Sequence, residues 1–331
     1  MANPHYVLGI DIGGTKLAVG IFTLAGTRMA AARIPTQAGD GPAAVIGRLV
    51  ELCRKVVDGA GVPWSAVAAA GVGCGGPLDT TRGLIQEPPN LPGWTEIPLV
   101  RLLQESLGIR VILENDANAA ALGEHRFGAG RGVANLIYLT VSTGIGAGVI
   151  IDHRLYRGAN GNAGEIGHIS VAYNGRPCNC GSQGCLEAYA SGSSLAARAR
   201  EALSAEPGSL LPILAGGPER ITAEIVVAAV RRGDPLAVRL WGETMEILGA
   251  GVASAINVFN PARVVMGGGM TNAGDLLFEP VRRIALRRAM RPLAEAVEIV
   301  PALLGDEVGV LGAAAVALNF LEVADHAVAL G

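Results

Sequence analysis

Four side chains that commonly bind metal ions gather in one stretch of the chain. Three cysteines, Cys178, Cys180 and Cys185, follow His168 at C-x-C and C-x₄-C spacings. Together they offer the Cys₃His set that structural zinc sites use. Glycines and a proline between them let the backbone turn back tightly. The pattern therefore predicts one tetrahedral Zn²⁺ bound by these four residues.

A loop closed by disulfide bonds is the alternative interpretation of the same cysteines. The chain has five cysteines, an odd number, and its first residues lack the charged and apolar segments of a secretory signal. Both features favour a reducing compartment, and we expect the protein to be cytoplasmic. The remaining two, Cys53 and Cys74, lie in apolar segments and are expected to be inert core residues.

Two carboxylates flank this cysteine stretch. Glu165 lies three residues before His168, and Glu187 lies two residues after Cys185. A zinc that ties the stretch together would hold both acidic side chains around one cleft. We therefore expect the metal to be scaffolding and the glutamates to contact a substrate.

The N-terminal segment has the pattern of a phosphate-binding hairpin. Residues 6–11 and 17–22 read as strands joined by the turn Ile12-Gly13-Gly14-Thr15-Lys16. It is no Walker A loop, because the glycine spacing differs and a strand follows. Its backbone N–H groups could hold phosphate, with Asp11 binding Mg²⁺ through water. The alternative is a plain hairpin that ends in an aspartate.

A second strand–glycine–strand segment follows later in the chain. Residues 135–141 and 149–151 read as strands around the glycine-rich turn at 142–148. Because this segment resembles the first hairpin, it suggests an internal duplication.

The candidate general base follows a short apolar strand at 110–114. In open α/β sheets ligands gather where strands end, so Asn115 and Asp116 are expected to lie at a ligand site. Asp116 could equally be the N-cap of the alanine-rich helix that follows. Asn90, in a proline-rich loop, could contact substrate or make an Asx turn.

The rest of the chain alternates helical and strand patterns. Strands are expected at 67–74, 263–266 and 297–300, and helices at 41–57, 99–107, 188–203, 222–232, 235–259, 276–289 and from about 308 onward. Residues 206–220 are the expected surface loop. The turn at 267–269 would let backbone approach a flat ring or a ribose.

Bulk properties exclude two classes of partner. The chain has 331 residues and a net charge of −3, which gives no broad basic surface for nucleic acid. Its mean hydropathy is +0.40, but no run of about 18 apolar residues predicts a membrane span. The length suits two domains or one large one.

Five motifs resemble those of the ROK family of bacterial sugar kinases and repressors. They occur in the family's order over nearly the whole chain: residues 11–16 (DIGGTK), 114–118 (ENDAN), 143–148 (TGIGAG), 165–168 (EIGH) and the C-x-C-G-x-x-G-C-L-E run at 178–187. The resemblance implies an α/β, actin/hexokinase-like (ribonuclease H-like) fold with ATP and sugar in the cleft between two domains. The expected domains are 1–117 plus 308–331, and 118–307 with the zinc site.

The resemblance also implies the reaction and the residues that carry it. The family phosphorylates a hexose or N-acetylhexosamine at its 6-hydroxyl with Mg·ATP, and Asp116 matches the general base. The implied sugar contacts are Gly76, Asn90, Asn115, Asp116, Glu165, His168 and Glu187. The implied nucleotide and phosphate contacts are Asp11, Gly13, Gly14, Thr15, Lys16, Thr143, Gly144, Gly146, Gly267 and Gly268.

Within the family, the loop at 89–94 and the run Glu187-Ala188-Tyr189-Ala190-Ser191 look most like glucokinases. The expected substrate is D-glucose, with an N-acetylmannosamine, N-acetylglucosamine or broad hexose kinase as the alternative. A sugar-sensing repressor is less favoured, because the hairpin begins at residue 6 and leaves no room for a DNA-binding segment. A carbohydrate-binding module with structural zinc is a further alternative. Relatives imply a dimer or tetramer, and some relatives use polyphosphate.

Overall fold

The computed structural model describes residues 5–329, and side chains for residues 5–323. Contacts divide the chain into two compact units. The first holds residues 1–132, 148–163 and 303–331, and the second holds residues 133–147 and 164–302. Helix α3 (Asp116–Phe127) packs within the first unit, against helix α11 (Val308–Ala329). The division predicted from the sequence, into residues 1–117 plus 308–331 and residues 118–307, stays a prediction.

The first unit is built on a five-stranded mixed sheet in the order β3-β2-β1-β4-β7. Strands β1 and β2 form the predicted antiparallel hairpin, whereas β1, β4 and β7 are parallel. Apolar side chains of α1 and α2 pack on one face of the sheet, and α11 packs on the other. The bounds are β1 Tyr6–Ile12, β2 Lys16–Thr23, β3 Arg28–Pro35, α1 Pro42–Gly59, β4 Val67–Cys74, α2 Leu99–Leu107 and β7 Arg110–Asn115; the short β5 (Leu78–Asp79) and β6 (Leu84–Ile85) form a separate pair.

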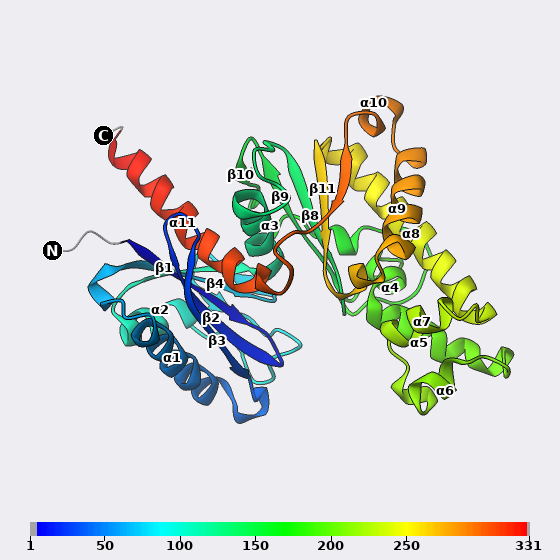
Figure 1. Cartoon of the computed structure of the whole chain (residues 1–331), viewed down its shortest axis with the longest axis horizontal. Coiled ribbons are helices and arrows are strands. Elements are labelled where there is room, and N and C mark those ends of the chain that lie inside the picture. The colour runs from blue at the N-terminus through cyan, green and yellow to red at the C-terminus, as the bar shows by residue number, and fades with distance from the viewer. Residues whose placement is uncertain (1–4, 330–331) are drawn as a thin grey trace. The chain divides into compact units, whose positions relative to one another are not determined.

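Glycines in two adjacent strands let α11 lie directly on the sheet (Figure 1). Gly9 in β1 and Gly71 in β4 are paired neighbours. A methyl group at Gly9 would lie 1.9 Å from the carbonyl oxygen of Val310, and one at Gly71 would lie 1.9 Å from that of Ala313. Because any larger side chain would overlap the helix backbone, these two positions set how closely α11 approaches.

The second five-stranded sheet, in the order β10-β9-β8-β11-β12, repeats the topology of the first. In each sheet, three strands that follow one another in the chain lie beside two further strands, which run parallel to the first of the three. This repeated topology is what the predicted internal duplication would produce. The strands are β8 Leu136–Val141, β9 Ile145–Ile151, β10 Arg154–Leu155, β11 Arg263–Gly267 and β12 Glu298–Pro301.

The α-helices of the second unit lie between β10 and β12 in the chain. Helices α8 and α9 pack side by side (Figure 1), and α7 and α5 also contact α8. The bounds are α4 Glu187–Ala190, α5 Gly192–Ala202, α6 Leu211–Ala215, α7 Ala223–Val230, α8 Pro235–Phe259, α9 Asp275–Arg288 and α10 Arg291–Ala294.

Most predicted elements are confirmed to within a few residues, but three segments are not. The predicted helix at 188–203 is broken at Ser191, whose hydroxyl accepts the Ser194 N–H at 3.2 Å and caps α5. The predicted loop at 206–220 contains α6. Strand β9 begins at Ile145 and not at residue 149, and β3 was not predicted at all.

No helix within the described part of the chain is long and apolar enough to cross a membrane.

Candidate functional site

The parallel strands of the first unit bring several predicted site residues to one edge of the sheet. Cys74, the last residue of β4, is paired with Ile12 on one side and Asn115 on the other. Asp11, one residue before Ile12, and Asp116, one residue after Asn115, therefore lie near the same edge of the sheet. A methyl group at Gly76 would lie 3.9 Å from Asn115 Nδ2, so Gly76 also lies here. This edge is where ligands gather in open α/β sheets.

Asp116 is the first residue of α3, and the residue before it caps the helix. Asn115 Oδ1 accepts the N–H groups of Ala117 at 2.9 Å and Asn118 at 3.2 Å. The N-cap alternative for Asp116 is therefore wrong, because Asn115 already fills that role with its extended backbone. Asn115 Nδ2 is left to serve as a donor at the edge.

The Asp116 carboxylate faces open space while protein surrounds its other sides. Its side chain is exposed, and Oδ1 accepts the Ala117 N–H at 2.8 Å. Desolvation by the surrounding protein nevertheless raises the pKa of Asp116, and the backbone hydrogen bond opposes that rise. A carboxylate that is reachable and more basic than usual suits proton abstraction.

Asp11 is the second carboxylate at this edge. Burial raises its pKa to about 6, nearby Lys16 lowers it, and the negative charge of Asp116 raises it. The charges of Asp116 and Lys16 therefore both act on the Asp11 carboxylate. A cation here would relieve the repulsion between the aspartates, and carboxylate oxygen is a ligand that Mg²⁺ prefers.

The tip of the first hairpin is held from two sides. Gly13 N–H bonds back to the Lys16 carbonyl at 3.0 Å, and the Thr36 hydroxyl donates to the Gly13 carbonyl at 2.6 Å. A methyl group at Gly14 would lie 2.7 Å from the Asn90 carbonyl oxygen, so the tip rests on the Asn90 loop. Thr15 and Lys16 are exposed at the tip. The predicted phosphate loop and Asn90 are thus neighbours.

The second unit holds the other predicted nucleotide residues. The turn at Ser142–Gly144 is anchored by α5, since Gly192 N–H donates to the Ser142 carbonyl at 2.7 Å and the Ser193 hydroxyl donates to the Thr143 carbonyl at 2.6 Å. A cavity of about 350 Å³ opens beside the turn. Thr143, Ser193, Arg200, Glu224 and Met270 are among the residues that line it.

Gly267 and Gly268 are explained first by strand packing. A methyl group at Gly267 would lie 2.6 Å from the Tyr138 hydroxyl, and one at Gly268 would lie 2.5 Å from the Val141 carbonyl oxygen. Gly268 also has φ +90°, which favours glycine. Both glycines are therefore required where β11 passes β8, whatever binds nearby. Gly146 lies within β9.

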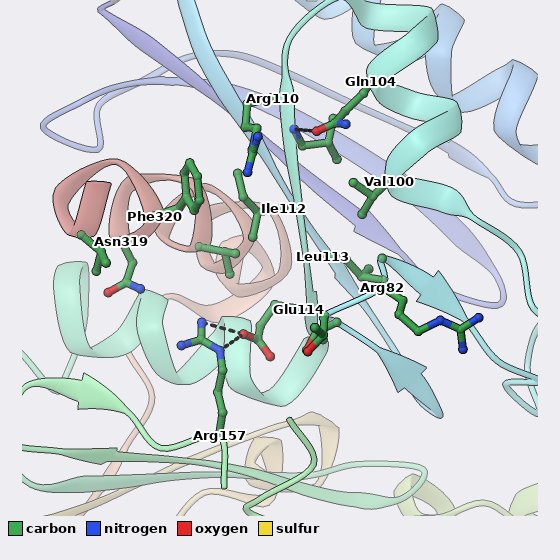
Figure 2. Close-up of a pocket in the computed structure, with 16 residues that line it drawn as sticks. Arg82, Val100, Gln104, Arg110, Ile112, Leu113, Glu114, Arg157, Asn319 and Phe320 are labelled. Atoms are coloured by element: carbon green, nitrogen blue, oxygen red, sulfur yellow. Dashed lines mark hydrogen bonds and ion pairs between the residues drawn. The ribbon is translucent and has the colours of Figure 1, made fainter. Parts of the chain in front are cut away.

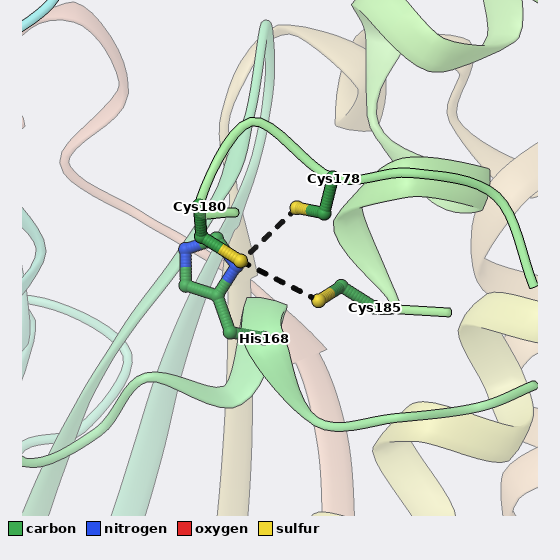
Figure 3. A group of neighbouring side chains, drawn as sticks. All are labelled: His168, Cys178, Cys180 and Cys185. Carbon is green, nitrogen blue, oxygen red and sulfur yellow. Dashed lines mark hydrogen bonds between the residues drawn. The ribbon is translucent and has the colours of Figure 1, made fainter. Parts of the chain in front are cut away.

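The four predicted zinc ligands come together in the second unit (Figure 3). Cys178 Sγ lies 3.7 Å from His168 Nδ1, and Cys180 Sγ lies 3.7 Å from Cys185 Sγ. A tetrahedral zinc with Zn–S bonds of about 2.3 Å has edges of about 3.8 Å, so these separations fit. All four ligand atoms lie within 4.8 Å of one another. Burial raises the pKa of Cys185 to about 12, so a cation is needed to keep it as a thiolate.

The two glutamates that flank the Cys₃His cluster make different contacts. His168 Nε2, the nitrogen turned away from Cys178, lies 3.8 Å from Glu165 Oε2. Glu187 Oε2 instead accepts the backbone N–H of Ile145 at 2.7 Å, beside the Thr143–Gly144 turn. One glutamate is therefore grouped with the histidine of the cluster, whereas the other connects the cysteine segment with the turn.

Glu114, two residues before Asp116, is the centre of a buried network of polar contacts that no sequence motif indicated. Glu114 is 1% exposed, and its Oε2 accepts hydrogen bonds from Arg157 Nε and Nη2, both at 2.8 Å. Its Oε1 accepts from Asn118 Nδ2 at 3.0 Å and Asn115 N–H at 3.1 Å. Glu114 could have been singled out from the sequence, because it is a glutamate within a largely apolar strand. Nothing in the sequence pointed to Arg157, which lies 43 positions away.

The arrangement is that of a two-sheet α/β protein with paired carboxylates at one sheet edge, glycine turns and a Cys₃His cluster. The ROK family model matches residues 7–319, so the chain belongs to the ROK family. A glucokinase of Thermotoga maritima is 38% identical over 310 residues, which cover 94% of this chain and 96% of that protein. The fold is accordingly the two-domain ROK, actin-like fold.

Solved structures of ROK proteins are also similar to this chain. A ROK hexokinase from Thermus thermophilus is 38% identical, with a TM-score of 0.81 over 97% of this chain and 99% of that one. A ROK glucokinase from Streptomyces griseus, solved with glucose and AMPPNP, is 36% identical, with a TM-score of 0.78 over 93% of this chain and 98% of that one.

Proposed function

We propose that this chain is a hexose kinase that transfers the γ-phosphoryl group of ATP to the 6-hydroxyl of D-glucose. The observation that carries the proposal is the position of Asp116, open to solvent at the sheet edge beside Asp11 and the glycine hairpin. Glucokinases and hexokinases of the ROK family are similar to the chain over nearly its whole length. A nucleotide analogue and glucose are bound together in one of these relatives.

Asp116 is proposed as the general base. Its carboxylate accepts the proton of the 6-hydroxyl while the oxygen–phosphorus bond forms. The bond from the γ-phosphorus to the bridging oxygen breaks, ADP leaves, and Asp116 releases its proton to solvent. The raised pKa makes the carboxylate a better base than an ordinary aspartate, provided that it stays ionised at the working pH.

The sugar contacts are proposed for two sets of residues, one at the sheet edge and hairpin tip and one beside the Cys₃His cluster. Gly76, Asn90 and Asn115 belong to the first set. Glu165, His168 and Glu187 belong to the second, where ionised carboxylates accept hydrogen bonds from sugar hydroxyls. His168 Nε2 remains available because Nδ1 faces the thiols.

The phosphates are proposed to bind to the hairpin Gly13–Lys16 and to the Thr143–Gly144–Gly146 segment, with Gly267 and Gly268 near the nucleoside. Phosphoryl transfer depends mainly on positioning and on charge neutralisation. When bound, Mg²⁺ neutralises charge on the phosphates, and Asp11 is the residue proposed to hold it, directly or through water. Zinc is proposed as structural, because four protein ligands leave no open position.

The deciding experiment measures kcat/KM with ATP on glucose, N-acetylglucosamine, N-acetylmannosamine, mannose and fructose by coupled ADP release. Glucose is expected to give the highest value. A higher value for an N-acetylhexosamine would overturn the glucose assignment and leave a sugar kinase. No ADP release with any sugar, from protein that still binds glucose, would favour a sensor or a binding module.

A further inference from the structure

A cavity of the first unit lies along the outer edge of β7 (Figure 2). It has a volume of about 520 Å³. Its walls come from residues 110–114 of β7, from α2, from residues 316–323 of α11, from the loop at residues 80–83 and from Arg157. Strand β7 ends the sheet, so this edge is not covered by another strand.

More arginines than carboxylates line this cavity: Arg82, Arg110 and Arg157 accompany one carboxylate, Glu114. Glu114 is neutralised by Arg157 at 2.8 Å, and Arg82 has Asp79 and Glu96 within 3.7 Å. Among the residues whose side chains are described, Arg110 has no ion-pair partner. It is held instead by cation–π contact with Phe320, 5.1 Å from the ring centroid.

Gln104 and Arg110 offer hydrogen-bond donors to the cavity. All four contacts of the Glu114 carboxylate are already made within the protein. Gln104 accepts the Val111 N–H at 3.2 Å through its oxygen, which leaves its NH₂ group to donate. The Arg110 guanidinium adds a planar set of N–H donors that matches phosphate oxygens. Asn319 completes the polar part of the wall.

We propose that this cavity is a second ligand site, for a small phosphorylated sugar, with the phosphate on Arg110 and the hydroxylated part toward Gln104 and Asn319. A cavity of this size exceeds a lone phosphate, and its polar walls suit hydroxyl groups. Glucose 6-phosphate, the product under the proposed function, belongs to this class. The site itself rests on the cavity and Arg110 and not on that reaction.

The experiment is calorimetric titration of glucose 6-phosphate, and separately of inorganic phosphate, into protein already saturated with glucose and AMPPNP. Saturation blocks the proposed active site, so further binding must occur elsewhere. Saturable binding of glucose 6-phosphate is expected in the parent. Arg110→Ala is expected to weaken it about tenfold or more, because a charge-assisted hydrogen bond is lost. Arg101→Ala is the control, since Arg101 pairs with Glu105 on α2 and does not line the cavity.

Each outcome decides the proposal. No saturable binding in the parent, or equal binding by Arg110→Ala, would overturn it. Equal affinity for inorganic phosphate would keep an anion site but overturn the sugar phosphate. Arg110→Glu is expected to abolish binding, and circular dichroism checks that each variant is folded. Failure of the proposed function would appear separately as absent turnover, because the heat of binding does not depend on catalysis.

Discussion

The carboxylate of Glu187 accepts the backbone N–H of Ile145 at 2.7 Å, so the end of the cysteine segment is fastened to the glycine turn of the second sheet. A methyl group at Gly144 would lie 2.5 Å from Glu187 Oε2, so the turn and the carboxylate are in direct contact. Glu187 follows Cys185, a predicted zinc ligand, by two residues. One side chain therefore connects the Cys₃His cluster with the predicted phosphate turn, and the proposed sugar contact falls to its other oxygen.

Replacing Glu187 separates these two duties. Glu187→Ala leaves the part-buried Ile145 N–H without its acceptor, which is expected to cost about 1–3 kcal/mol of stability and to raise the KM for ATP. Glu187→Gln keeps an acceptor oxygen and is expected to retain most of the stability. Thermal unfolding and ATP kinetics of both variants test this. Equal melting temperatures for the two variants would show that the contact does not hold the turn.

Asp116→Asn tests the general base. The amide cannot accept the hydroxyl proton, so kcat is expected to fall by about 10² to 10⁴ while ATP affinity and the melting temperature change little. Because the pKa of Asp116 is raised, parent activity is expected to fall on acidification at a higher pH than for an ordinary aspartate. A variant that turns over within a few-fold of the parent would remove Asp116 from the mechanism.

Asp11 makes a pH-dependent contribution to stability. Its folded pKa of about 6 is raised above the ordinary 3.8, so the folded state binds the proton more tightly than the unfolded state. Ionisation therefore costs stability as the pH rises from about 4 through about 6, by at most ~3 kcal/mol. Asp11→Asn lacks this cost and is expected to exceed the parent in stability at pH 8, with the difference shrinking toward pH 4.

Urea unfolding of Asp11→Asn across this pH range measures the effect. Asp58→Asn, at an exposed position of α1, is the matched control and should show no such trend. If the difference between Asp11→Asn and the parent did not change with pH, burial would not govern the titration of Asp11.

The zinc site can be tested by metal content. One zinc per chain is expected, with Zn–S distances near ~2.3 Å by X-ray absorption. Cys178→Ala is expected to lose the metal and to lower both the melting temperature and glucose affinity, because the cluster positions Glu165 and Glu187. Cys53→Ala, a core cysteine outside the cluster, should keep full zinc content. Parent protein purified without zinc would contradict the assignment.

The sequence was sufficient to predict features that depend on local spacing. The four predicted metal ligands lie within 18 positions, and each hairpin joins two strands that follow one another in the chain. The sequence was not sufficient where long-range packing decides. Glycines at 146 and 148 suggested a turn, yet both lie in strand β9. Long-range packing explains the glycine at 148, because a methyl group there would lie 2.8 Å from the Ala117 carbonyl oxygen.

Two other misses have the same physical origin. Strand β3 lies at the edge of its sheet, has three consecutive alanines between its two arginines and contains no buried residue, so it lacks the hydrophobic signal of a buried strand. The pairing of Glu114 with Arg157 joins residues that no local pattern relates. The choice between Asn115 and Asp116 as the helix cap depends on backbone geometry, because both side chains can cap a helix.

Gly71 tests the close packing of α11 on the first sheet. A methyl group there would lie 1.9 Å from the Ala313 carbonyl oxygen and 2.9 Å from the Ala317 nitrogen, both backbone atoms that cannot rotate away. Gly71→Ala is therefore expected to destabilise the fold by more than about 1–3 kcal/mol, the usual cost of overpacking, because the whole helix must shift. Gly47→Ala in α1 is the control: nothing lies within 4 Å of its added methyl, and alanine is expected to stabilise the helix by about 0.5–1 kcal/mol. Denaturant unfolding of both variants would thus show opposite signs. If Gly71→Ala matched the parent in stability, α11 would not rest on β4 at the distance that these glycines permit.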